Sequence, residues 1–243
     1  MPVSLPQLLA SIVHHREHAL PNHCLRFVRC LQACDLRTWE RLVAVAAAEG
    51  AALAELGCLQ LAQAHSLMQL RYGEGVPCPD MLLQRCSATW EAHLLAKQRK
   101  HQQLQGRAVS HFESLLAAAV AELAGSNAVV AGHVVRSRQS EPLLLADLAL
   151  AQLGIAVEAD GPRHFIRNRA GPDGQPLLNG TTRARNRLLR HHGWHVVQVP
   201  YWVFDAGLET GAPQAALCAY LRQHTDLASL IAGGVAAAAP AAE

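Results

Sequence analysis

The chain has 243 residues, 51% of them hydrophobic and 16% charged, and its formal net charge at pH 7 is +2. This composition is typical of a globular protein, and no apolar run approaches the ~18 residues of a membrane span, which predicts a soluble chain. The seven cysteines are odd in number and include no Cys-x-x-Cys pair, which argues against a disulfide framework or a zinc ribbon.

Residues 1–106 are predicted to form a helical region. The first twenty residues match neither a signal peptide nor an Arg-rich transit peptide. Apolar residues then recur at helical spacing after Asp35, between Ala51 and Tyr72, and from Pro79 onward, with glycine and proline at the breaks. Two interpretations of these Leu-rich helices stay open, ordinary packing or a short helical-repeat array.

Gly106 is the predicted boundary to an α/β domain at residues 107–231. Beyond it the apolar pattern predicts an amphipathic helix, three strands, a helix, a strand and a last helix. The expected segments are residues 112–123, 128–135, 143–150, 153–160, 181–192, 194–200 and 213–224. This order is compatible with a mixed sheet flanked by helices. Residues 232–243 are small and repetitive, and we expect them to be disordered because they bury too little surface.

Three carboxylates interrupt the apolar runs of the predicted strand hairpin. Side chains alternate faces along a strand, so Glu158 and Asp160 point away from the side that Val157 occupies. Asp147 supplies a third carboxylate from the neighbouring run. Burying an ionised carboxylate without a partner costs several kcal/mol. The three acids therefore predict a metal, a basic partner, or a sheet face that is open to solvent or ligand.

Positive charge is concentrated in the segment that follows this hairpin. Between Arg163 and His195 the sequence places seven arginines against one acid, Asp173, although the whole chain carries only +2. The first part of the segment is a basic loop. Its charged or titratable residues are Arg163, His164, Arg167 and Arg169.

The second part of the basic segment reads as a helix that begins near Thr181. A period of 3.6 residues places Arg183, Arg187 and Arg190 in one stripe. Arg185 falls on the opposite, apolar side, so we expect its guanidinium to lean over the sheet toward the carboxylates. The stripe is either a solvated helix face or a surface that neutralises phosphates.

Two aromatic residues, Tyr201 and Trp202, follow the last predicted strand. They belong either to the core or to a surface on which unpaired bases stack. If these two residues lie at the same edge of the domain as the arginines, cationic groups that neutralise phosphates and aromatic groups that stack on unpaired bases occur together.

A series of short blocks between residues 147 and 202 resembles the RAP domain. The order and the gaps of these blocks make the resemblance specific. The blocks are Asp147, Glu158-Ala-Asp-Gly-Pro-Arg-His164-Phe165, Asn179-Gly180-Thr181, Arg185-x-Arg187-Leu188-Leu189, Gly193-Trp194 and Val199-Pro200-Tyr201-Trp202.

RAP domains lie near the C-terminus of organellar RNA-metabolism proteins, including FAST-kinase-like and octotricopeptide proteins. They are similar to the restriction-endonuclease-like core of very-short-patch-repair nucleases, in which an Asp and a Glu-x-Lys motif hold a divalent metal. The resemblance implies an α+β chain, with an N-terminal α-helical region followed by a restriction-endonuclease-like α/β RAP domain. Two positions depart from the pattern: Asp160 stands where an active nuclease has lysine, and Val203-Phe204 replaces a Glu-Trp pair.

The resemblance implies an RNA-binding protein that acts in RNA processing, stability or translation in a mitochondrion or chloroplast. We expect single-stranded RNA as the partner, no membrane association and no cofactor. The residues expected to contact RNA are Arg163, Arg167, Arg169, Arg183, Arg187, Arg190, Tyr201 and Trp202.

Two alternatives stay open. In the first, the chain is a Mg²⁺-dependent endoribonuclease in which Asp147, Glu158 and Asp160 hold the metal and Arg185 or His164 assists. Without a metal, the same three acids would tether Arg185, His164 and backbone donors. In the second alternative, the helical region is a scaffold that docks a protein partner.

Overall fold

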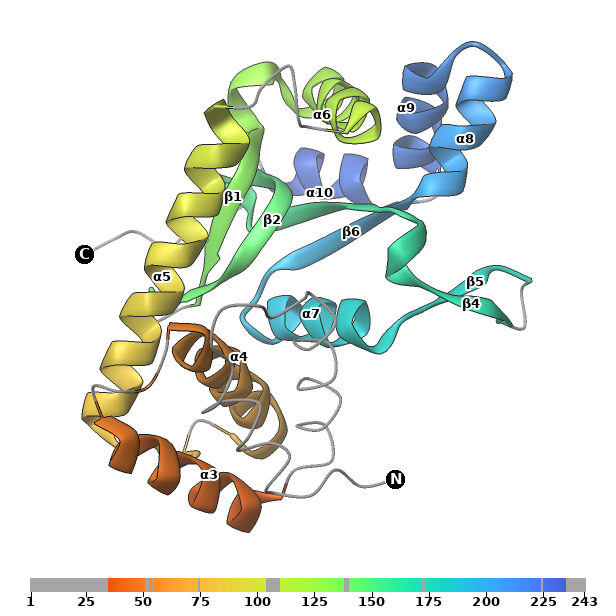
Figure 1. Ribbon diagram of the computed structural model, residues 1–243. Helices are drawn as coiled ribbons and strands as arrows, with labels where there is room; N and C mark the ends of the chain where they lie inside the picture. Colours follow the sequence, from red (N-terminus) through yellow and green to blue (C-terminus); the bar gives the residue numbers. More distant parts are fainter. Residues whose placement is uncertain are drawn as a thin grey trace.

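The structure is a computed structural model, and it describes residues 35–50, 53, 55–73, 75–103, 110–137, 140–171, 174–223 and 225–234 (Figure 1). The expectation about targeting signals concerns residues outside this part of the chain. No helix within it is long and apolar enough to cross a membrane.

The N-terminal region consists of three helices, α3 (Leu36–Glu49), α4 (Glu55–Tyr72) and α5 (Asp80–Gln103). The Asp35 side chain caps α3 by accepting a hydrogen bond from the Thr38 backbone N–H at 2.7 Å. The three helices share one apolar core, whose largest fully buried side chains are Trp39, Leu42, Met68 and Leu94. The predicted helices are therefore confirmed between residues 36 and 103, although α4 begins four residues later than expected.

The second region is built on a four-stranded mixed sheet in the order β1-β2-β3-β6. β1 (Val130–Arg136), β2 (Pro142–Leu150) and β3 (Ile155–Asp160) are antiparallel, whereas β6 (His195–Pro200) runs parallel to β3. The predicted hairpin of two apolar runs is β2 and β3. The α+β class, with N-terminal helices followed by a mixed sheet, is confirmed.

Helices cover both faces of this sheet (Figure 1). On one face, α6 (His111–Ala124), α9 (Pro213–Gln223) and α10 (Leu227–Gly234) pack on a core that includes Ile155, Val157 and Ala159. On the other face, Leu189 of α7 (Gly180–His191) packs against Ala156 of β3. The alternation that the sequence predicted for β3 is therefore confirmed. It turns Glu158 and Asp160 toward the side of α7.

The structure differs from the expected segments in three places. The basic loop contains a short hairpin of β4 (Phe165–Ala170) and β5 (Pro176–Leu178), which pair only with each other and carry no apolar alternation. The aromatic residues after β6 start a further helix, α8 (Tyr201–Glu209), for which Pro200 is the N-cap residue. α10 reaches Gly234, three residues into the segment expected to be disordered, because its apolar side chains pack on the sheet core. Residues 235–243 lie outside the described residues.

The long helix α5 connects the helical region to the sheet. Its Trp90 indole N–H donates to the Leu143 carbonyl of β2 at 3.0 Å, and Glu91 lies 2.5 Å from the guanidinium of Arg136 on β1. Val134 of β1 completes the helical core. The predicted boundary at Gly106 lies between α5 and α6, in a segment that the structure does not describe.

We expect residues 107–231 to fold as a separate fragment, because they contain the whole sheet, α6 and α9 and most of α10 on one face, and α7 on the other. The fragment should melt cooperatively but at a lower temperature than the full chain. Loss of the Trp90 hydrogen bond alone costs about 1 kcal/mol, and apolar surface on β1 becomes exposed. Calorimetry of the two proteins tests this, and a non-cooperative transition of the fragment would contradict the boundary.

Candidate functional site

The candidate site lies where the β2–β3 pairing ends. The two strands pair over only three residues, from Leu150 and Ile155 to Leu148 and Val157, and β3 continues alongside β6 alone. Side chains supply the missing hydrogen bonds at this opening. Asp147 accepts from the Ala159 backbone N–H at 2.9 Å, and the Arg185 guanidinium donates to the Leu145 carbonyl at 2.5 Å.

Glu158 is buried in this opening, with 1% of its side chain exposed. A terminal nitrogen of Arg185 lies 2.7 Å from Glu158 Oε2, so the two side chains form an ion pair, although the nitrogen is not aligned for a hydrogen bond. Burial raises the pKa of Glu158 well above its usual value, Arg185 opposes this shift, and the neighbouring Asp147 and Asp160 add to it. The expected lean of Arg185 toward the carboxylates is confirmed.

The raised pKa of Glu158 predicts a pH-dependent stability. Between the usual pKa of 4.5 and the raised folded-state pKa, the folded state holds a proton that the unfolded state has released, so the resulting stabilisation is complete below pH 4.5. It is lost as pH rises through the folded-state pKa. The free energy of unfolding of the wild type should therefore fall relative to that of Glu158→Gln between pH 5 and 8. Urea titrations of both proteins across this range test the sign, and a wild type that gains stability relative to Glu158→Gln as pH rises would contradict it.

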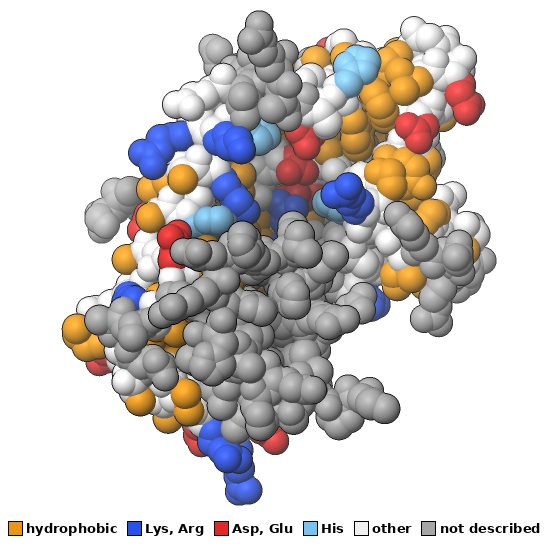
Figure 2. Space-filling model, viewed as in Figure 1, with side chains coloured by type: hydrophobic (Ala, Val, Ile, Leu, Met, Phe, Trp, Pro, Cys, Tyr) orange, Lys and Arg blue, Asp and Glu red, His pale blue; other side chains and the backbone are white. Residues whose placement is uncertain are grey.

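Asp160 is buried to the same degree but has two polar partners. One carboxylate oxygen lies 2.6 Å from His164 Nδ1, and the other accepts a hydrogen bond from the Gln198 side-chain amide at 2.7 Å. The His164 side chain is 32% exposed, so this ring leads from the buried carboxylate to the surface. On the face drawn in Figure 2, acidic side chains lie in a recess that basic and histidine side chains border.

The arrangement of the three acids does not fit a divalent metal. The Arg185 guanidinium occupies the position beside Glu158 that a cation would take, and protein donors engage both oxygens of Asp160 and one oxygen of Asp147. Among the described residues, no group of three or more His, Cys, Asp or Glu side chains is placed to hold a metal ion. The geometry favours an internal network that holds Arg185 and His164. The catalytic assignment of these five residues stays a prediction.

Helix α7 presents the basic stripe. It begins at Gly180, close to the expected start near Thr181, and its N-cap is Asn179. The Asn179 side chain accepts from the Thr182 backbone N–H at 2.9 Å and donates to the Arg163 carbonyl at 2.7 Å. Arg183, Arg187 and Arg190 are exposed, as expected. None of these three forms an ion pair with another residue in the described part of the chain.

The remaining residues expected to contact RNA lie around the β4–β5 hairpin. Arg163 is exposed in η4 (Pro162–His164), a short 3₁₀ helix just before β4. Arg167 and Arg169 belong to β4, but their side chains are outside the described part of the structure. These two assignments therefore stay predictions.

Tyr201 and Trp202 form an aromatic cluster with Phe165 at the base of the hairpin. The ring centroid of Phe165 lies 4.8 Å from the ring centroid of Trp202 and 5.8 Å from that of Tyr201. All three residues are half-buried, and Tyr201 also packs against the sheet core. The rings pack on one another and each residue stays partly exposed, so both interpretations of the aromatic pair stay open.

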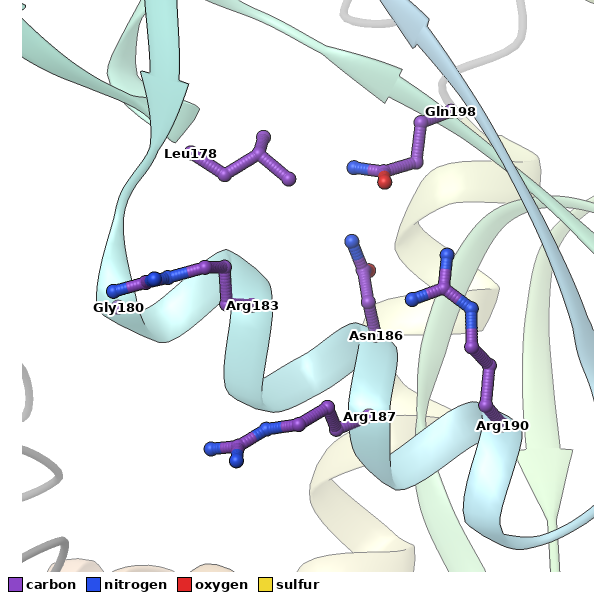
Figure 3. Close-up of a pocket in the computed structure, with 7 residues that line it drawn as sticks. All are labelled: Leu178, Gly180, Arg183, Asn186, Arg187, Arg190 and Gln198. Atoms are coloured by element: carbon purple, nitrogen blue, oxygen red, sulfur yellow. The ribbon is translucent and has the colours of Figure 1, made fainter. Parts of the chain in front are cut away.

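A pocket of about 500 Å³ lies between α7, the end of β5 and β6 (Figure 3). Its lining residues are Leu178, Gly180, Arg183, Asn186, Arg187, Arg190 and Gln198. No carboxylate is among them. Leu178, Asn186 and Gln198 were not foreseen from the sequence. A signal existed for Asn186, which is three residues after Arg183 and four before Arg190, and therefore belongs to the same helix face.

A family model described as RAP domain matches residues 157–206. The match begins in β3, ends in α8, and includes Glu158, Asp160, the hairpin and all of α7, whereas Asp147 precedes it. A search of curated proteins finds no significant match to the chain. RAP domains are generally associated with RNA binding. Residues 157–206 of this chain are therefore similar to a RAP domain.

Proposed function

We propose that this chain binds single-stranded RNA through α7 and the pocket beside it. The observation that carries the proposal is the exposed stripe of Arg183, Arg187 and Arg190, which borders a pocket without carboxylates. An arginine stripe that serves only solubility is normally interspersed with acids, and α7 has no acidic residue at all.

The chemistry of the stripe suits a polyanion. A guanidinium offers several N–H donors in a fixed plane and forms paired hydrogen bonds with phosphate oxygens. Residues three and four apart on a helix are neighbours, so the three arginines can follow successive phosphates of one strand. The positive end of the α7 macrodipole lies at Gly180, at the rim of the same pocket, and adds to the attraction.

The aromatic cluster supports a preference for single strands. Phe165, Tyr201 and Trp202 lie at the root of the hairpin that follows Arg163, and these partly exposed aromatic side chains offer stacking partners to unpaired bases. The resemblance to RAP domains of FAST-kinase-like and octotricopeptide proteins supports a role in organellar RNA processing, stability or translation. A mitochondrion or a chloroplast is the proposed location.

The test is fluorescence anisotropy of the full chain with labelled 12-nucleotide single-stranded RNA at rising salt concentration. Each phosphate contact should contribute about −0.7 to the slope of log affinity against log salt. We expect a slope of about −2 or steeper, and weaker binding to a duplex of the same sequence. No measurable binding, or binding without salt dependence, would contradict the proposal.

We expect Mg²⁺ to leave the bound RNA intact. Arg185 holds the position beside Glu158, and Asp160 replaces the lysine that would position or activate an attacking water in a nuclease. Gel analysis of RNA incubated with the chain and Mg²⁺ or Mn²⁺ measures this. Cleavage by the wild type that Glu158→Gln abolishes, with RNA affinity preserved, would favour the endonuclease instead.

A further inference from the structure

The pocket beside α7 contains a buried amide without a protein partner. Asn186 is 2% exposed, and neither its Nδ2 nor its Oδ1 atom has a hydrogen-bond partner in the described part of the chain. In Figure 3 this side chain points from α7 toward Gln198 and Leu178, across the pocket. Buried amides are nearly always satisfied, so the orientation of Asn186 points to a ligand that supplies both a donor and an acceptor.

The second amide of the pocket has a fixed orientation. The Gln198 Nε2 atom donates to Asp160 at 2.7 Å, and a carboxylate only accepts, so the amide nitrogen must face Asp160. This leaves Gln198 Oε1 as an acceptor. His164 holds the other oxygen of Asp160 at 2.6 Å and thereby prevents the carboxylate from turning. The network of acids described above therefore also positions a side chain of the pocket.

These amides discriminate between the ligands that a basic pocket could hold. A phosphate offers only acceptors, so it could accept from Asn186 Nδ2 but would leave Asn186 Oδ1 and Gln198 Oε1 without donors. An amino group beside an acceptor ring nitrogen can satisfy all three atoms: the ring nitrogen accepts from Asn186 Nδ2, one amino N–H donates to Asn186 Oδ1, and the other N–H, on the far side of the amino nitrogen, donates to Gln198 Oε1. Adenine and cytosine have this arrangement, and asparagine pairs with adenine in this bidentate manner. On the pairing edge of guanine the amino group lies beside an N–H donor instead. Uracil carries a single N–H on its pairing edge.

The other walls of the pocket suit the rest of a nucleotide. Leu178 gives an apolar surface for the plane of a base, and Arg183, Arg187 and Arg190 line the same pocket with cations for the adjoining phosphates. A volume of about 500 Å³ lies within the ~300–1,000 Å³ of sites that enclose a small organic ligand. The pocket is therefore large enough for one nucleotide and far larger than a phosphate needs.

We propose that the pocket between α7, β5 and β6 takes one unstacked adenine or cytosine of a bound RNA strand, read by the amides of Asn186 and Gln198. The inference rests on the proposed RNA binding and adds base preference to it. The arginines would hold the strand irrespective of sequence, and the two amides would select the base.

The test compares 12-nucleotide RNAs made only of A, only of C or only of U, with the full chain at one salt concentration. We expect A or C to bind about tenfold more tightly than U, the low end of the discrimination by a bidentate base contact. A further RNA carries purine riboside, which lacks the amino group, in place of adenosine. It should bind about as weakly as U, although its bases still stack. This comparison needs no protein variant.

Asn186→Leu, which has nearly the same shape but no polar atoms, should reduce binding of A and C to the level of U. The salt slope should stay as steep as in the wild type, because it reports the arginines. Equal affinity of the wild type for A, C, U and purine riboside RNA would overturn the inference, since Asn186 would then bind only water. So would an unchanged preference in Asn186→Leu. If the wild type bound none of these RNAs, the proposed function itself would fail.

Discussion

Arg185→Met is expected to lower the free energy of unfolding by about 3 kcal/mol, because it leaves the buried carboxylate of Glu158 without its cation. The value is the low end of the usual range for breaking a buried pair, since Arg185 keeps 23% of its side chain exposed. The Leu145 carbonyl also loses its donor at the place where β2 and β3 separate. Urea unfolding at pH 7.5 measures the change.

A matched control comes from the same helix. Arg183→Met makes the same chemical change at an exposed position, and it should alter stability by less than about 0.5 kcal/mol. Glu158→Gln in the Arg185→Met background should recover part of the loss, because a neutral amide costs less to bury than an unpaired carboxylate. If Arg185→Met and Arg183→Met were equally stable, the ion pair at the sheet opening would have no structural role.

Arg183→Glu combined with Arg187→Glu is expected to weaken RNA binding by at least about tenfold, because it places two negative charges where phosphates are neutralised. The loss should be similar for all sequences, since phosphate contacts carry no base information. The salt slope should become shallower by about 1.4, which is 0.7 for each lost contact. Stability should barely change, because both side chains are exposed and unpaired within the described part of the chain.

The control for this variant changes the net charge equally on another surface. Arg37→Glu with Arg41→Glu alters two exposed arginines of α3, in the helical region. We expect this control to retain most of the RNA affinity and the full salt slope. An equal loss in both variants would mean that overall charge, rather than the α7 stripe, governs binding. An unchanged slope in the α7 variant would make the stripe a solvated face.

The sequence by itself determined the features that follow from local periodicity. Alternation along residues 155–160 assigned Val157 to the core and Glu158 to the opposite face, and a period of 3.6 residues separated Arg185 from the exposed stripe of α7. These assignments hold because the backbone geometry of a strand or helix fixes the direction of each side chain. The lean of Arg185 toward a carboxylate followed from the same geometry and from the cost of burying an unpaired acid.

Only the tertiary structure decided how these residues meet. The pairing of β2 with β3 stops at Leu148, and no local sequence pattern encodes this opening. There the Asp147 carboxylate accepts a hydrogen bond from a backbone N–H of β3, and the Arg185 guanidinium donates to a backbone carbonyl of β2. The pocket joins Leu178, Asn186 and Gln198 from three elements, so their proximity depends on how α7 packs across the sheet. In each case the contact links residues distant in sequence, and packing and strand register, rather than propensity, select it.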